Sequence, residues 1–509
     1  MIAITKSCVV IGIEAFPVNI EADISNGLPA FNIVGLPENA VRESRERVKA
    51  AIKNSGYSFP SKRITINLAP ADLKKEGTGL DLPIAVAILT ATGLIDSNRS
   101  ADFHITGELS LDGTVKPVKG MLPMAIAHAK WESDGIIAPE QNAVEGAIVP
   151  GSAIFPISHL SELVDFLNGN KQVERQDSDI AGIMAAGRES APDFNEVTGQ
   201  EQAKRAMEIA AAGGHNVFMS GPPGSGKTML ARRLPSIMPD MTFEEALETT
   251  VIYSVAGLLD SDRPLVVQRP FCSPHHTISD AGLTGGGSIP RPGQVSLAHN
   301  GILFLDELPE FRRNVLENLR QPVENGHITI SRANISLTFP CNFTLVAAQN
   351  PCPCGYLGSN QRECVCTQAQ IARYRNRISG PLLDRLDIQI EVPAVPYRDL
   401  TAERKSASSM EIRKRVMAAR DIQLKRFSGT GIFCNSRMGP AEIKKYCRTG
   451  NRERAFLNRI MEKINLSARS YHRLLKISRT IADLEGADAI ETRHISEAVQ
   501  YRSLDRKDI

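Results

Sequence analysis

Residues 221–228 carry the pattern G-x-x-x-x-G-K-T, which constrains the fold more than any other part of the chain. The residues are Gly221, Pro222, Pro223, Gly224, Ser225, Gly226, Lys227 and Thr228. Apolar residues 217–219 precede the pattern and a helical pattern follows it, giving the order strand, loop, helix. Glycines let backbone N–H groups turn toward phosphates, and the amino end of a helix adds positive potential. We therefore expect a nucleoside triphosphate site in an α/β domain, with Lys227 on the β- and γ-phosphates and Thr228 on Mg²⁺.

A second strand pattern ends in two acids. Residues 302–305 are apolar, and Asp306 and Glu307 follow them directly. Buried parallel strands deliver polar side chains at their carboxyl ends. We expect Asp306 in the Mg²⁺ shell and Glu307 as the group that polarises the attacking water, a pair that favours ATP hydrolysis. The alternative interpretations are a glycine-rich turn for the first pattern and a strand end with solvated acids for the second.

The composition of the 509 residues, with 42% hydrophobic and 23% charged residues, is typical of a globular protein of about three domains. Its most apolar stretch, residues 82–95, is shorter than the ~18 residues that a membrane span requires, and no basic-then-apolar leader opens the sequence. We expect a cytoplasmic location without a membrane partner, with the nine cysteines reduced or metal-bound. A net charge of +2 does not by itself indicate a polyanion partner. An aromatic content of 5% argues against base stacking as a mode of nucleic-acid binding, so any such contact should run through phosphates.

The pattern along the chain predicts four segments. Residues 1–168 alternate strand-like and helical runs, which predicts an α+β domain. A polar linker at 169–192 leads to an α/β core at 193–396 that holds the nucleotide motifs. Residues 397–509 have a helical pattern throughout, which predicts a bundle. Its expected helices cover 410–427, 440–448, 451–464, 467–485 and 491–502.

Three further patterns define the type of nucleotide-binding domain. The apolar strand at 346–349 ends at the amide Asn350, as a sensor-1 position requires. Residues 382–387, which contain Arg385, resemble an arginine-finger segment, and Arg469 at the start of a predicted helix resembles sensor 2. Together with residues 197–200, these patterns make residues 193–505 resemble a magnesium-chelatase-type AAA+ ATPase.

The resemblance implies roles for these residues. Asn350 would orient water near the γ-phosphate, Arg385 would act on the ATP of a neighbouring subunit, and the subunits would form a ring, with a hexamer as the expected number. The alternatives are a structural Arg385 paired with Asp384 or Asp387, and an Arg469 that is a solvated helix residue.

Two insertions bear on the substrate. Residues 328–338 read as a hairpin before sensor 1, where helicase-type relatives place a pore hairpin, and Arg332 is the matching basic residue; an exposed turn is the alternative. Residues 279–293, which include Arg291, are rich in glycine and proline and resemble a second pore loop. Both arginines are candidate DNA contacts. The adjacent His275 and His276 are interpreted as packed or hydrogen-bonded rather than as metal ligands.

Four cysteines follow sensor 1 in the pattern C-x-C-x₉-C-x-C: Cys352, Cys354, Cys364 and Cys366. Residues i and i+2 of an extended chain face the same way, so each pair can present two thiolates to one ion. The spacing is tighter than that of common structural zinc sites. The pattern is compatible both with a zinc site and with four reduced thiols.

The first domain resembles the Lon protease domain in two motifs, at residues 75–82 and at 107–118. The position of the nucleophile in that pattern holds Gly79, and the position of the general-base lysine holds Leu122. Because neither a hydroxyl nor an amine is present, we expect a module that does not cleave peptides and serves in assembly or nucleic-acid binding.

The complete arrangement, with residues 274–279 reading Pro-His-His-Thr-Ile-Ser, resembles the ComM/YifB subfamily. That resemblance implies an α/β multidomain protein with a Lon-like α+β domain, an AAA+ P-loop core and a helical lid. It also implies an ATP-driven hexameric DNA motor, a helicase that promotes branch migration on single-stranded, duplex or branched DNA during natural transformation. The alternatives are a chelatase-type ATPase that remodels another partner or inserts metal into a tetrapyrrole, and an ATP-dependent protease.

Overall fold

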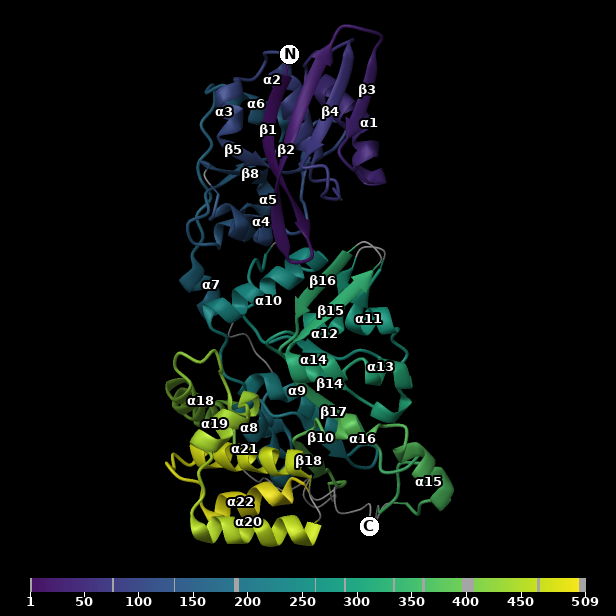
Figure 1. The fold of residues 1–509 in the computed structure, drawn as a ribbon, viewed down its shortest axis with the longest axis vertical. Helices are drawn as coiled ribbons and strands as arrows, with labels where there is room; N and C mark the ends of the chain where they lie inside the picture. Colours follow the sequence, from purple (N-terminus) through teal and green to yellow (C-terminus); the bar gives the residue numbers. More distant parts are fainter. Residues whose placement is uncertain are drawn as a thin grey trace. The chain divides into compact units, whose positions relative to one another are not determined.

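In the computed structural model, the chain forms two compact units. One unit comprises Met1–Gly187 and Phe243–Val267, and the other comprises Arg188–Thr242 and Gln268–Ile509. The structure describes residues 2–75, 77–131, 133–186, 192–260, 262–287, 290–332, 335–358, 362–395, 407–464 and 467–502. Each unit is described by itself below (Figure 1).

The first unit is built on a mixed seven-stranded sheet in the order β3-β4-β2-β1-β5-β8-β9. The strands are β1 (Ile2–Ile11), β2 (Glu14–Ser25), β3 (Ala30–Val34), β4 (Arg63–Ala69), β5 (Phe103–Ile105), β8 (Gly135–Pro139) and β9 (Ile154–Ile157). β1 and β2 form a long antiparallel hairpin from Ile2↔Asp23 to Ile11↔Glu14, whereas β5, β8 and β9 run parallel. The fold is therefore α+β: β1, β2 and β4 pair antiparallel, and the other strand pairs of the sheet are parallel.

Helices cover this sheet. They are α1 (Asn39–Asn54), α2 (Asp81–Ala91), α3 (Ser97–Ala101), α4 (Met121–His128), α5 (Glu140–Ala147), α6 (Leu160–Leu167) and α7 (Ile180–Ala186). The short strands β6 (Glu108–Leu109) and β7 (Val115–Lys116) pair beside them. Every residue of α2 is buried, which agrees with its apolar sequence on all sides. α7 lies within the segment that the sequence predicts to be a linker.

The first unit also contains α10 (Phe243–Ala256), although this helix lies in sequence between elements of the second unit. Val251 belongs to the same buried cluster as Cys8 and Met121, and Leu247 packs against that cluster. Ser254 Oγ donates to the carboxylate of Glu145, whose pKa is raised by burial. α10 is thus an integral part of the core of the first unit.

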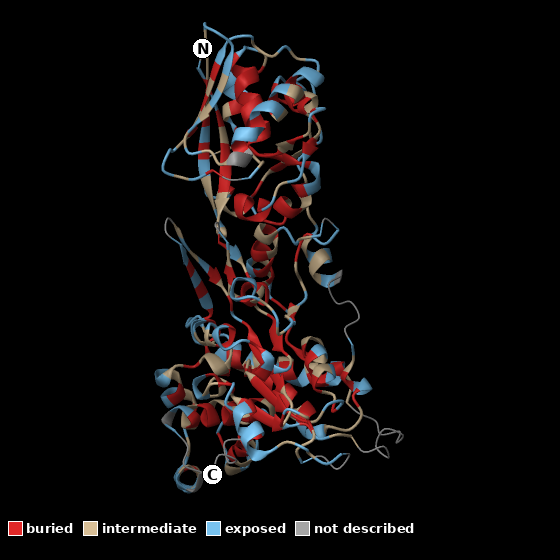
Figure 2. Cartoon of the chain, turned by 90° about the vertical axis from the view of Figure 1, so that its right-hand side faces the viewer, coloured by how far each residue is buried: buried red, intermediate tan, exposed pale blue. Residues whose placement is uncertain are grey.

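The second unit contains a five-stranded parallel sheet in the order β11-β14-β17-β10-β18. The strands are β10 (Val217–Ser220), β11 (Phe271–Cys272), β14 (Ile302–Leu305), β17 (Thr344–Gln349) and β18 (Ile388–Glu391). Nearly all their residues are buried (Figure 2). Because all strands are parallel, their carboxyl ends meet at one edge of the sheet, where ligands bind in such folds.

Helices and short elements surround this sheet. They are η1 (Phe194–Glu196), α8 (Glu201–Gly213), α9 (Lys227–Ile237), η2 (Leu308–Glu310), α13 (Arg313–Glu317), α14 (Arg320–Asn325), α15 (Gln368–Arg375) and α16 (Gly380–Leu383). Two insertions interrupt them. The first comprises α11 (Asp280–Thr284), β12 (Gly285–Gly286), β13 (Arg291–Pro292) and α12 (Gln294–Leu297). The second is the hairpin of β15 (His327–Arg332) and β16 (Ile335–Pro340), which projects from the sheet (Figure 1).

The last part of the second unit is a helical lid. It comprises α18 (Ser409–Arg426), η3 (Asn435–Arg437), α19 (Pro440–Tyr446), α20 (Asn451–Ile464), α21 (Ala468–Leu484) and α22 (Thr492–Gln500). The lid shares one apolar core with the sheet, in which Leu474 and Ile481 join Val217 and Val346. None of the described helices combines the length and the apolar character needed to cross a bilayer.

Candidate active site

The phosphate loop lies between β10 and α9, as its sequence predicts. Gly224 and Gly226 have positive φ angles of 74° and 92°, which favour glycine at both positions. Gly221 is equally constrained, because a Cβ there would lie 2.1 Å from the Val392 carbonyl oxygen. The loop therefore uses its glycines for two backbone turns and one close approach to the end of β18.

Lys227 begins α9 and turns back over the loop. Its Nζ donates to the carbonyl oxygens of Gly221 (2.7 Å) and Pro222 (2.9 Å), and to Oδ1 of Asn350 (3.2 Å). Burial lowers the pKa of Lys227, and the charges of Asp306 and Glu307 oppose that shift. The ammonium group is thus held over a concave backbone, where a phosphate can compete for its hydrogen bonds.

The acids lie at the carboxyl end of β14, the second strand from β10. Oγ1 of Thr228 donates to Oδ2 of Asp306 at 2.7 Å, which joins the two predicted Mg²⁺ ligands. Glu307 follows with a φ of 52°, the left-handed conformation that is uncommon for residues other than glycine. Asn350 follows β17, which lies between β14 and β10. Three neighbouring strand ends therefore bring together the phosphate loop, the acids and the sensor amide.

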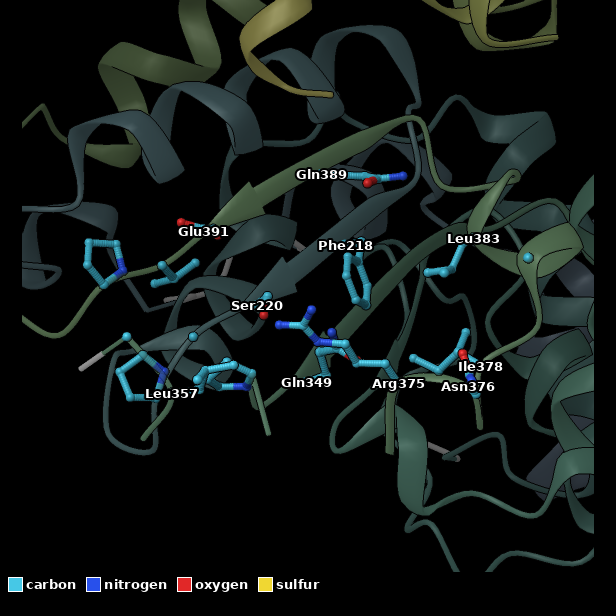
Figure 3. Close-up of a pocket in the computed structure, with 17 residues that line it drawn as sticks. Phe218, Ser220, Gln349, Leu357, Arg375, Asn376, Ile378, Leu383, Gln389 and Glu391 are labelled. Atoms are coloured by element: carbon cyan, nitrogen blue, oxygen red, sulfur yellow. The ribbon is translucent and has the colours of Figure 1, made fainter. Parts of the chain in front are cut away.

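A cavity of about 430 Å³ adjoins the phosphate loop. Ser220, Gly221 and Pro222 form one side of it, and Arg375 lines it together with Gln349 and Glu391 (Figure 3). Pro351, Leu357 and Gly358 from the four-cysteine loop complete the wall. Lys227, Thr228, Asp306 and Glu307 do not line this cavity, so it adjoins the phosphate-loop site and does not contain it. Arg375 and Glu391 are absent from the sequence-based prediction of the site, because no local pattern marks them as neighbours of the phosphate loop.

Arg385 and Arg469 lie together in a second cavity, of about 330 Å³. The Arg385 guanidinium pairs with Glu324 at 2.8 Å, and that of Arg469 lies 3.8 Å from the same carboxylate. Asp387, one of the alternative partners of Arg385, instead pairs with Arg473 at 3.3 Å.

The second cavity lies at the amino edge of the sheet. Asn216, which lines it, immediately precedes β10, and its side chain donates to the carbonyl of Arg385. The phosphate loop follows the other end of the same strand. Four strand residues span about 13 Å, so the two arginines face away from the phosphate loop of their own subunit.

The two insertions touch each other through Arg332. Its Nε donates to the Gly287 carbonyl at 3.2 Å, which links β15 to the loop after β12. Arg291 is exposed in β13, opposite Gly286. Hydroxyl pairs between β15 and β16, Thr329 with Thr338 (3.0 Å) and Ser331 with Ser336 (2.9 Å), cover one face of the hairpin. The predicted polar tip, residues 333–334, lies outside the described residues.

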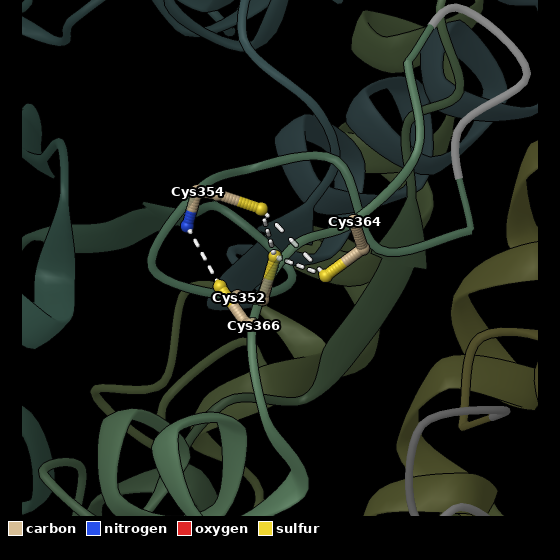
Figure 4. A group of neighbouring side chains, drawn as sticks. All are labelled: Cys352, Cys354, Cys364 and Cys366. Atoms are coloured by element: carbon tan, nitrogen blue, oxygen red, sulfur yellow. Dashed lines mark hydrogen bonds between the residues drawn. The ribbon is translucent and has the colours of Figure 1, made fainter.

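The four cysteines after sensor 1 converge on one point (Figure 4). Their sulfur atoms all lie within 4.8 Å of one another. Sγ of Cys352 lies 3.3 Å from that of Cys354 and 3.6 Å from that of Cys364. Backbone N–H groups of Cys354 and Leu357 point at the sulfurs of Cys366 and Cys352, both at 3.4 Å. A hydrogen bond from the Tyr356 backbone lowers the pKa of the Cys354 thiol to about 6. The cluster can bind a metal ion.

Comparison with known protein families accounts for most of the chain. The model described as magnesium chelatase, subunit ChlI, matches residues 193–400, and its C-terminal counterpart matches 406–502. A third model, subunit ChlI of Mg-chelatase, matches 20–142. The chain belongs to the magnesium-chelatase ChlI family. Membership in this family of AAA+ ATPases implies ATP and Mg²⁺ as ligands of the site.

Relatives within this family match over nearly the full length. YifB of Salmonella typhimurium is 46% identical over 99% of the chain and 98% of its own length. The competence protein ComM of Haemophilus influenzae is 44% identical over 99% of the chain and 98% of its own length. The family and its AAA+ architecture, predicted from the motifs, are confirmed.

A Lon protease also matches part of the chain. Lon protease 2 of Bacillus subtilis is 30% identical over 28% of the chain and 27% of its own length. Gly79 is tightly surrounded, because a Cβ there would lie 3.2 Å from Thr106 Oγ1 and 3.3 Å from Val118. Leu122 is buried, and its backbone N–H donates to Glu145. Gly79 and Leu122 therefore occupy packed positions and offer neither a hydroxyl nor an amine.

Proposed function

We propose that the protein is an ATP-driven motor that acts on DNA as a ring of subunits, with six as the expected number. The observation that carries the ring is the position of Arg385 and Arg469 at the sheet edge opposite the phosphate loop. A guanidinium there cannot complete the site of its own subunit, but it can complete that of a neighbour in a head-to-tail assembly. The ATPase would then depend on assembly.

Each residue of the site would have a separate role in ATP hydrolysis. Lys227 would bind the β- and γ-phosphates, Glu307 would accept the proton of the attacking water, and Asn350 would orient that water. Arg385 of the neighbouring subunit would stabilise the charge that develops on the γ-phosphoryl oxygens. Bound Mg²⁺, held by Thr228 and Asp306, would neutralise phosphate charge.

Two observations favour DNA as the substrate. Arg332 and Arg291 lie on two touching insertions, and the hydroxyl pairs of the hairpin add neutral donors, which together suit contact with a phosphate backbone. A relative that is 44% identical over nearly its full length is named a competence protein. We therefore propose that the motor is a helicase that promotes branch migration while incoming DNA is integrated during natural transformation.

We further propose that the four-cysteine cluster binds Zn²⁺. Tetrahedral zinc with four thiolates requires sulfurs about 3.8 Å apart, and the 3.3–3.6 Å separations lie close to that value. The N–H groups that point at two of the sulfurs match the hydrogen-bond donors that surround thiolate metal sites. Purified protein should contain about one zinc per chain, and replacing Cys364 and Cys366 by Ser should abolish zinc binding. Cys434→Ser, outside the cluster, is the matched control; zinc-free protein with four titratable thiols would contradict the proposal.

ATP turnover measured with single-stranded, duplex and branched DNA tests the proposed function. We expect DNA to raise kcat in the wild-type protein and branched DNA to be unwound or migrated, while Lys227→Ala shows neither activity. A chelatase would ignore DNA and respond to a tetrapyrrole, and a protease would respond to an unfolded polypeptide. Turnover that no form of DNA changes would refute the DNA assignment.

A further inference from the structure

The four-cysteine loop, residues 352–366, packs against the phosphate loop. Gly355 has a φ of 85°, and a Cβ at this position would lie 2.7 Å from two ring carbons of Pro223. The same Cβ would lie 3.8 Å from the amide carbon of the Asn350 side chain. Only glycine therefore allows the backbone of the four-cysteine loop to approach both the phosphate loop and the sensor-1 amide so closely.

Pro223 can transmit this contact to the backbone amides that would bind phosphate. The pyrrolidine rings of Pro222 and Pro223 fix φ at both residues, so the position of the Pro223 ring sets the direction of the N–H groups that follow it. Lys227 connects the phosphate loop to the sensor, because its Nζ donates to the Pro222 carbonyl at 2.9 Å and to Asn350 Oδ1 at 3.2 Å. A shift of the four-cysteine loop would therefore move both the phosphate loop and the sensor.

The four-cysteine loop is itself held at both ends. Cys352 lies two residues beyond the sensor-1 amide and is fully buried. Its carbonyl accepts from the Gly355 N–H at 2.9 Å, and the N–H of Leu357 points at its sulfur at 3.4 Å. Thr367 directly follows the last cysteine and starts α15 with a capping box. Because the four sulfurs converge between these two ends, the shape of the loop depends on what the sulfurs bind (Figure 4).

We propose that the four-cysteine loop positions the phosphate loop, so that metal binding to the cysteines and ATP binding to the phosphate loop strengthen each other. The proposal rests on the ATP site and the zinc site proposed above, but not on DNA. The effect has to be reciprocal: if zinc raises the affinity for ATP by some factor, ATP raises the affinity for zinc by the same factor. A zinc ion that only stabilised its own loop would show neither effect.

Binding measurements on the full-length protein with and without zinc test this linkage. The probes are Zn²⁺ and a non-hydrolysable ATP analogue with Mg²⁺, and a zinc-selective chelator removes the zinc. We expect zinc-free protein to bind the analogue about tenfold more weakly, and the analogue to lower the Kd for zinc by the same factor, about tenfold. If the protein binds zinc but its affinity for the analogue is the same with and without the metal, the linkage is refuted.

Gly355→Ala tests the contact itself, and Gly358→Ala is the matched control. Gly358 also has a left-handed φ, of 74°, but a Cβ there would meet no atom of the described residues within 4 Å. We expect Gly355→Ala to keep its zinc, to bind the analogue about tenfold more weakly, and to lose the dependence of that binding on zinc. Gly358→Ala should resemble the wild type in all three properties.

Thermal unfolding establishes that both variants are folded. Native affinity for the analogue in Gly355→Ala, or an equal loss of affinity in both variants, would overturn the proposal. If Gly355→Ala does not fold, the zinc-dependent affinity of the wild-type protein still decides the question. If the wild-type protein binds no zinc, the proposed zinc site fails, while the two glycine variants still decide whether the four-cysteine loop positions the phosphate loop.

Discussion

Arg385→Ala gives the sharpest test of how the subunits cooperate. The guanidinium lies at the amino edge of the sheet, about 13 Å of strand away from the phosphate loop, so in the proposed ring each subunit borrows it from a neighbour. Its removal should leave ATP binding intact and lower kcat by about 10³–10⁵, the contribution of an arginine finger. The ion pair with the half-exposed Glu324 contributes little to stability, so the variant should fold normally.

The ATPase rate of a mixture of Arg385→Ala and Lys227→Ala protein tests this arrangement quantitatively. Neither variant should hydrolyse ATP alone. In a random equal mixture, an interface is active when an intact Lys227 from the first variant faces an intact Arg385 from the second, which occurs at about one quarter of interfaces. ATPase should therefore recover to roughly a quarter of the wild-type rate per subunit. Arg373→Ala, which removes an exposed arginine of α15, is the control and should be active alone. If mixing restores no activity although the variants co-assemble, Arg385 does not act on a neighbour.

Three further outcomes are expected. Glu307→Gln should bind ATP with near-native affinity yet abolish turnover, because an amide cannot accept the proton of water; turnover at the native rate in a nucleotide assay would rule out Glu307 as the base. Arg332→Ala should keep the basal ATPase rate but weaken binding to all DNA sequences alike. In a binding titration at several salt concentrations, the slope of log affinity against log salt should become shallower by about one unit for each phosphate that the arginine no longer neutralises. Native affinity and native salt dependence would refute the hairpin contact. Asp483→Ala should destabilise the lid by about 3–5 kcal/mol, since it leaves the buried guanidinium of Arg479 and the partly buried one of Arg426 without their carboxylate. Exposed Asp421→Ala should change the free energy of unfolding in urea by less than about 0.5 kcal/mol.

The sequence predicted the helices of the lid closely because their signals are local. The helix expected at 467–485 is Ala468–Leu484, and Ser467 caps its start by accepting from the Ser470 N–H. The helix expected at 410–427 is Ser409–Arg426, with a capping box formed by Ser408 and Glu411. Apolar periodicity and polar caps within a few residues define such elements without reference to the rest of the chain.

The centre of the candidate site was predictable for a related reason. Lys227, Asp306 and Asn350 each follow a short apolar strand, and parallel strands place such residues at one sheet edge. The cavity beside the phosphate loop was not predictable, because Arg375 and Glu391 reach it through long-range packing. The shared partner of Arg385 and Arg469, Glu324, likewise carries no local signal, and the sequence offered only neighbouring acids as alternatives.

The sequence also did not reveal where α10 packs. The core that this helix completes depends on the Cys8 and Met121 surface far away in the chain, which no local pattern can indicate. Residues 243–267 belong to the first unit, although stretches of the second unit flank them in the sequence.

The position of residues 243–267 in the first unit has a consequence for protein engineering. The backbone passes between the two units three times, near residues 187, 242 and 267, rather than once through a single linker. A fragment cut at residue 168 would leave the apolar surface that α10 covers open to water, and an ATPase fragment begun at 193 would carry an apolar helix with no core to enter. The first unit thus cannot be deleted or exchanged as a single terminal segment. A deletion of the first unit that leaves the second unit folded must also replace residues 243–267 with a short loop.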